Sequence, residues 1–323
     1  MPPPSDLARS TALGGGIAAG ALALLAWCLV VFGALVRAHG AGLACPDWPL
    51  CFGELIPEFD LQVAFEWGHR VMAGALSVVL VGLVAFVLRV RELRARFAPT
   101  IAVIIGLLVV QIVLGGLTVL LGLAPWTVTA HLVTGNSFVV SLAWLSIGLR
   151  EFARPASIHR AELPGAVEKL IALCALALVV QFVLGGLVSS NYAGLACATF
   201  PLCNSDSLAP SLAGPVGLHV LHRLNAYLLC GAYALLAWRA RGCERIGRLS
   251  GLGLGIAVSQ VAVGVANVLL EVPREVTGLH SALATALALA TALVVREALA
   301  ARLTASAGAQ VASRRPRALE GAR

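Results

Sequence analysis

Two ten-residue stretches, GLACPDWPLC at residues 42–51 and GLACATFPLC at residues 194–203, decide how this chain is organised. The second begins 152 residues after the first, and long apolar segments flank both. Self-similarity at a fixed spacing is the signature of repeated structural units. We therefore expect two related halves, each containing one copy of this cysteine-bearing loop.

The repeat extends outward from these loops at nearly the same spacing. The recurring pairs are His69-Arg70 with His222-Arg223, Gln111 with Gln260, and His131 with His280. Each half contains four apolar segments. Because four is an even number, both halves cross a membrane in the same direction, and an axis along the membrane normal relates them.

The composition indicates a protein whose solvent is lipid. The 323 residues are 59% hydrophobic and 12% charged, with a mean hydropathy of +0.91. A bilayer core about 30 Å thick requires roughly 20 apolar residues per helix. Eight such spans are expected, at 16–37, 67–88, 100–121, 127–149, 168–190, 216–238, 249–270 and 277–297. The predicted fold is an all-α integral membrane protein of eight transmembrane helices, arranged as two pseudo-symmetric four-helix bundles.

These spans divide the chain into five parts. The expected parts are a disordered cytoplasmic N-terminus (1–15), a first four-helix repeat (16–150), a cytoplasmic linker (151–167), a second four-helix repeat (168–298) and a cytoplasmic tail (299–323).

Basic residues predict the orientation. Of the 23 Lys and Arg residues, 19 fall on one side of the predicted spans. The positive-inside rule makes that side the cytoplasm and places both termini there, in a cell membrane. The remaining four are outer-end arginines, Arg37, Arg70, Arg223 and Arg274. The positive charges form no single basic face, so a nucleic-acid partner is not expected.

Four histidines, His69, His131, His222 and His280, lie near the outer ends of the even-numbered spans. For a single intramembrane histidine, an interhelical hydrogen bond is the simpler interpretation. Four histidines in two repeated pairs favour metal ligation, because imidazole is a common metal ligand. One histidine from each of two facing helices can hold a haem iron. The pattern therefore predicts two bis-histidine haem sites, His69 with His131 and His222 with His280.

Glu66 breaks the symmetry between these two sites. It precedes His69 by three residues, on the same helical face, and its counterpart in the second half is His219. A carboxylate at one site alone suggests that one site performs chemistry while the other holds a resident cofactor. The alternative is that Glu66 is a first-turn acid that complements the helix dipole.

The cysteines of the two loops have matching six-residue spacing. Cys45 and Cys51 recur as Cys197 and Cys203 on the side expected to be oxidising, so local disulfides Cys45–Cys51 and Cys197–Cys203 are predicted. Free thiols in a reducing setting are the alternative.

Three of the outer arginines are candidate contacts of the haem propionates, because arginine pairs well with carboxylates. They are Arg37, Arg70 and Arg223. Extension of these side chains to the lipid headgroups is the alternative.

Taken together, these residues resemble the haem A synthase family. The matching groups are Gly33-x-x-x-Arg37 leading into GLACPDWPLC, Glu66-x-x-His69-Arg70, His131, His222-Arg223 and His280. The resemblance covers all eight spans and omits the two termini.

The resemblance implies that haem O is the substrate and haem A the product, through successive hydroxylations of the methyl group at ring position 8 to a formyl group. It implies that His69 and His131 flank the substrate haem, that Glu66 is the catalytic acid, and that His222 and His280 ligate a haem b. Membrane lipid, haem O synthase and cytochrome oxidase assembly factors are the expected partners, with an unidentified electron donor. The competing hypothesis is a bis-histidine dihaem electron carrier that leaves its haems unmodified.

Overall fold

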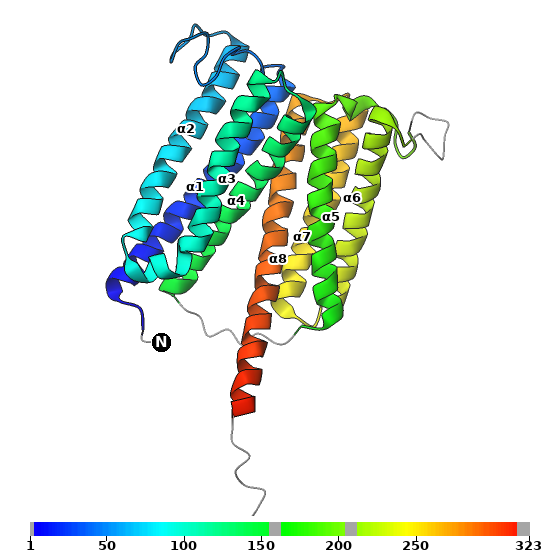
Figure 1. Cartoon of the computed structure of the whole chain (residues 1–323). Coiled ribbons are helices and arrows are strands. Elements are labelled where there is room, and N and C mark those ends of the chain that lie inside the picture. The colour runs from blue at the N-terminus through cyan, green and yellow to red at the C-terminus, as the bar shows by residue number, and fades with distance from the viewer. Residues whose placement is uncertain (1–2, 155–162, 204–211, 315–323) are drawn as a thin grey trace, which may run out of the picture.

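The structure, a computed structural model, describes residues 3–154, 163–203 and 212–314. These residues form eight long α-helices and one short 3-10 helix (Figure 1). In chain order the elements are α1 (Asp6–Ala38), α2 (Leu61–Leu88), α3 (Arg91–Leu120), α4 (Pro125–Ala153), α5 (Gly165–Ser190), η1 (Ala193–Leu195), α6 (Gly214–Arg239), α7 (Glu244–Leu269) and α8 (Arg274–Arg314).

Within the described part of the chain, all eight α-helices are long and apolar enough to cross a membrane. The chain is an all-helical, multi-pass membrane protein, as predicted. Helices α1–α4 and α5–α8 form two bundles that lie side by side (Figure 1). The halves meet through α1, α4, α5 and α8. Both cysteine-bearing loops lie at one end of the molecule, and the start of α1 and the end of α8 lie at the other (Figure 1).

The pseudo-twofold axis between the halves is marked by residues that touch their own repeat counterparts. Thr285 in α8 donates a hydrogen bond of 2.7 Å to Asn136 in α4, and both are buried. They are 149 residues apart, the spacing that also relates His131 to His280. Near the end that carries the cysteine-bearing loops, which the sequence predicts to be the outer end, Arg37 donates to Ser189, 152 residues later, over 3.0 Å. Equivalent positions can meet in this way only close to the axis that relates them.

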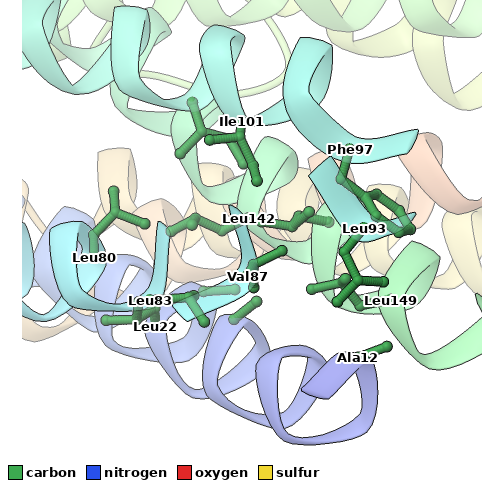
Figure 2. Packing of buried hydrophobic residues seen from close by; sticks show 14 of the residues in the cluster. Ala12, Leu22, Leu80, Leu83, Val87, Leu93, Phe97, Ile101, Leu142 and Leu149 are labelled. Carbon is green, nitrogen blue, oxygen red and sulfur yellow. The ribbon is translucent and has the colours of Figure 1, made fainter. Parts of the chain in front are cut away.

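The core of the first bundle fills the part of the membrane span away from the loops. Leu80, Leu142 and Leu149 are completely buried between α1, α2, α3 and α4 (Figure 2). Leu80 and Leu142 each follow a histidine of the same helix by 11 residues, which is about 16 Å along an α-helix. The histidines therefore lie above the packed core, toward the outer loops.

The prediction of a disordered segment over residues 1–15 is wrong for residues 6–15, because α1 begins at Asp6. The side chain of Ser5 caps the helix by accepting from the Ala8 N–H, and it also donates to Glu92 at the start of α3 over 2.6 Å. Ala8 and Ala12 are fully buried in the core. Short, weakly apolar side chains do not reveal this burial in the sequence, because it depends on the packing of other helices.

The opposite end of the chain also differs from the prediction. Helix α8 continues to Arg314, so the first part of the predicted tail, 299–314, is helical. The predicted linker 151–167 contains the end of α4 and the start of α5. Residues 155–162 of that linker and residues 315–323 of the tail lie outside the described part of the chain.

The contact at the axis yields a stability prediction. Thr285→Val removes a donor and leaves the buried Oδ1 of Asn136 without this partner, so the free energy of unfolding should fall by about 1–2 kcal/mol. The matched control is Thr127→Val, because the equally buried Thr127 hydroxyl donates only to Ala124 of its own helix. Denaturant unfolding in detergent measures both variants. Equal losses in the two variants would contradict a role for the axial hydrogen bond.

Candidate functional site

Each even-numbered helix carries one of the four paired histidines near the end with the cysteine-bearing loops, and the imidazole of that histidine packs directly against a glycine of the preceding helix. A Cβ atom added at any of these glycines would approach the Cε1 atom of the ring to 3.1–3.4 Å. The contacts are Gly33 with His69 (3.1 Å), Gly115 with His131 (3.4 Å), Gly185 with His222 (3.1 Å) and Gly264 with His280 (3.1 Å). The four helix pairs therefore present their imidazoles in the same way.

The structure brings the two histidines of each predicted pair near enough to influence each other electrostatically, His69 with His131 and His222 with His280. Their pairing as ligands of one iron stays a prediction. The Nδ1 atoms of His69, His131 and His280 are buried without a hydrogen-bond partner, so each of these imidazoles has an unsatisfied ring nitrogen.

Paired imidazoles of this kind fit a haem. A haem bound here would need ligands for its iron besides the porphyrin nitrogens, and two histidines from facing helices would supply them. The glycine next to each ring lets the imidazole lie against the backbone of the neighbouring helix. The residues present therefore suit one haem in each half.

Glu66 is buried between α2 and the first outer loop. Its carboxylate accepts a hydrogen bond of 2.9 Å from the backbone N–H of Cys45 and forms an ion pair with Arg70. Helix α2 begins at Leu61, with Asp60 as its N-terminal cap, so Glu66 lies in the second turn. The alternative interpretation of Glu66 as a first-turn acid is therefore wrong.

Arg70 fastens the first loop to α2. Its guanidinium donates to the backbone carbonyls of Cys45 (3.2 Å), Asp47 (2.7 Å) and Leu50 (2.6 Å). Within the loop, the Asp47 carboxylate accepts from the backbone N–H groups of Phe52 and Gly53. The hydrogen bond from Gly53 is the main reason that the pKa of Asp47 lies below its usual value. The loop is thus held in one shape directly above the first histidine pair.

The second loop is held by an equivalent arginine but a different partner. Arg223 donates to the carbonyls of Cys197 (2.8 Å) and Thr199 (2.9 Å), as Arg70 does in the first half. His219, the counterpart of Glu66, is also buried, and its Nδ1 forms a hydrogen bond of 3.0 Å with the carbonyl of Ala193. Glu66 and His219 therefore each bond their loop to the helix, but only the first half has a carboxylate at this position.

Both predicted disulfides are present. The structure joins Cys45 to Cys51 and Cys197 to Cys203, and all four cysteines are buried. The duplicated spacing was the signal that identified them.

The third outer arginine, Arg37, lies at the boundary between the halves. It donates to the hydroxyl and the carbonyl of Ser189, and its guanidinium carbon lies 4.6 Å from the centre of the Tyr192 ring. Arg37, Arg70 and Arg223 thus all hold outer segments in place. A contact between any of them and a haem propionate stays a prediction.

Three glutamines that sequence analysis did not connect with the site also belong to it. Each lies four residues before a ring-contacting glycine, in α3, α5 or α7, and donates to the backbone carbonyl of the histidine on the next helix. The bonds are Gln111 to His131 (3.0 Å), Gln181 to His222 (3.2 Å) and Gln260 to His280 (3.0 Å). The sequence contains a signal for two of them, in QIVLGG at 111–116 and QFVLGG at 181–186.

Comparison with known proteins agrees with this arrangement. A family model described as COX15-CtaA, cytochrome oxidase assembly protein, matches residues 17–64 and 58–292. The chain is 30% identical over 296 residues to a haem A synthase of Shewanella oneidensis, covering 78% of this chain and 87% of the relative. It is also 30% identical over 246 residues to a haem A synthase of Symbiobacterium thermophilum, covering 73% and 79% respectively.

The loop anchors yield a second prediction. Arg70→Gln removes the ion pair with Glu66 and the bonds to three loop carbonyls, so the amides of Cys45 and Gly53 should exchange with deuterium at least about tenfold faster. Arg89→Gln, at the other end of α2, is the control, because Arg89 contacts only the ring of Phe86 there. Unchanged protection of the loop in Arg70→Gln would show that the disulfide alone holds it.

Proposed function

We propose how this chain works on the premise that it belongs to the COX15-CtaA family of cytochrome oxidase assembly proteins and functions as a haem A synthase, an enzyme that acts on haem. The reaction we propose is an oxidation of haem O. Two hydroxylations replace two C–H bonds of the methyl carbon at ring position 8 by C–OH bonds, and the resulting geminal diol loses one oxygen as water to leave the formyl group of haem A. The change removes four electrons from this carbon, and an oxidant supplied from outside the chain must accept them. The observation that supports this assignment is the carboxylate of Glu66, which lies three residues from one histidine of the first pair and is replaced by His219 at the corresponding position of the second half.

The substrate site is the first-half pair. His69 and His131 hold haem O between α2 and α4, and Glu66 lies three residues from His69, about 60° away around the helix. A carboxylate at this position can accept a proton from the reacting group and return it, which an amide cannot do. Arg70 orients the carboxylate through their ion pair, and the N–H of Cys45 holds its second oxygen.

The second-half pair holds a resident haem b. His222 and His280 are its ligands, and when bound it supplies reversible transfer of single electrons. His219 replaces the carboxylate at this position and is hydrogen-bonded to the Ala193 carbonyl, so the described residues place no acid at the position that corresponds to Glu66. The role of this half is to pass electrons rather than to alter its haem.

A second candidate function, a dihaem electron carrier, is favoured by one observation. The Glu66 carboxylate accepts from the Cys45 N–H and pairs with Arg70. The same two interactions would stabilise the loop of an electron carrier in which Glu66 has no chemical role. The experiments on Glu66 below separate the two functions.

The chain lies in the cytoplasmic membrane, with both termini in the cytoplasm and both disulfide loops outside. The distribution of the basic residues supports this orientation. The histidine pairs and Glu66 then lie near the outer surface. Haem O synthase, which supplies the substrate, and cytochrome oxidase assembly factors, which accept the product, are the expected neighbours.

The decisive variant is Glu66→Gln. It should accumulate haem O, with some singly oxidised alcohol, and its haem A formation should fall about a hundredfold or more, the usual scale for loss of a proton-transfer group. Chromatography of extracted haems measures this. His219→Gln is the control and should retain haem A formation. Deuterium exchange of the loop in the same variant separates a chemical from a structural loss, and wild-type haem A formation in Glu66→Gln would reject the catalytic role.

A separate prediction concerns the resident haem. His222→Ala or His280→Ala should abolish a low-spin, six-coordinate haem b spectrum while the chain still inserts into the membrane. The matched control is His39→Ala, because the His39 ring stacks on Phe65 outside both pairs. A spectrum that persists in both ligand variants would mean that other residues hold this haem.

A further inference from the structure

The glutamine–histidine bonds are present in three of the four helix pairs, and the first pair departs from the pattern. The position four residues before the ring-contacting glycine is Gln111 in α3, Gln181 in α5 and Gln260 in α7, but it is Leu29 in α1. A leucine side chain cannot donate a hydrogen bond, so α1 has no means of clamping the backbone of His69 from this position.

The hydrogen bonds between glutamine and histidine are most numerous at His222. The Gln181 amide nitrogen lies 3.2 Å from the His222 carbonyl and 3.2–3.3 Å from the two ring nitrogens. The Gln181 carbonyl in turn accepts from Asn225 of α6 over 2.7 Å. Helices α5 and α6 are therefore joined by several hydrogen bonds at the level of the ligand.

The surroundings of His69 are apolar by comparison. Its ring meets Gly33 of α1, and the centre of the Phe32 ring lies 5.9 Å from its own. Leu29 packs against the core of the first bundle. Only van der Waals contacts thus connect α1 with the histidine of α2 at this level.

The place of α2 in the fold adds to this difference. In each half, one histidine is on a central helix, α4 or α8, which packs against several helices including some of the other half. The other histidine is on a peripheral helix, α2 or α6, which packs mainly against its two chain neighbours (Figure 1). The peripheral helix is secured by a glutamine in the second half and lacks that bond in the first.

We propose that Leu29 makes His69 the exchangeable ligand of the first-half site, so that haem enters and leaves on the α2 side while His131 stays fixed by Gln111. The inference rests on the proposed function, because a substrate site must release its product whereas a resident cofactor stays bound. On this account Gln111, Gln181 and Gln260 are positioning residues. Leu29 occupies the equivalent position in α1 and leaves the His69 carbonyl without the corresponding hydrogen bond.

The test measures haem loss from the purified full-length chain in detergent, loaded with haem O and haem b. Excess apomyoglobin captures released haem, and chromatography of the haem that stays on the chain distinguishes haem O from haem b. Leu29→Gln should slow the loss of haem O about two- to tenfold, the range expected from one hydrogen bond. Leu29→Met, of similar size without a donor, is the matched control and should behave as wild type.

Two further variants test the glutamines themselves. Gln181→Leu should speed the loss of haem b by a similar factor, and Gln111→Leu should speed the loss of haem O. These outcomes keep the proposal testable even if Leu29→Gln folds poorly. A haem O loss rate that is the same in Leu29→Gln and Leu29→Met, or that is unchanged in Gln111→Leu, would overturn it.

The same experiment separates this inference from the proposed function. A wild-type chain that binds haem O without converting it would contradict the proposed reaction, but the loss rates would still decide the role of Leu29. Normal conversion together with a haem O loss rate that does not respond to Leu29→Gln would contradict the role of Leu29 alone.

Discussion

The contact between an imidazole and a glycine is the interaction on which the arrangement of this molecule depends. A ring can lie against the backbone of a neighbouring helix only where that helix has no Cβ atom, and the four ring-bearing helices each meet such a position. This contact sets how closely each pair of helices approaches at its outer end. Because the histidine positions are nearly equivalent, two half-sites of similar depth result, and differences between them arise from the residues around the rings.

Those differences are concentrated in the first half. Glu66 meets the loop with a carboxylate where His219 meets it with an imidazole, and Leu29 stands where Gln181 would tie two helices together. Under the proposed function, the carboxylate adds a group that can transfer a proton, and the leucine leaves His69 without the hydrogen bond that secures His222. A site that receives, alters and releases a haem would need both features, and the second half has neither at these two positions.

Much of this could be predicted from the sequence, because hydropathy and repeat spacing are properties of the chain itself. The spans, the histidine pairs and the cysteine pairs were visible in that way. The start of α1 was missed because the burial of Ala8 depends on the packing of other helices. The link from Glu66 to the N–H of Cys45 and the bond from Gln111 to a histidine carbonyl were missed because backbone partners leave no trace in side-chain patterns.

The hydrogen bond between Asn136 and Thr285 bears on how the two halves evolved. Before the gene was duplicated these two positions were one residue, so their contact would have been a residue meeting its own copy across the twofold axis of a homodimer. In such a dimer every mutation alters both sites at once, and neither site can specialise without the other. Fusion of the two copies into one chain removes that coupling, so that an acid can arise beside one histidine pair without altering the other.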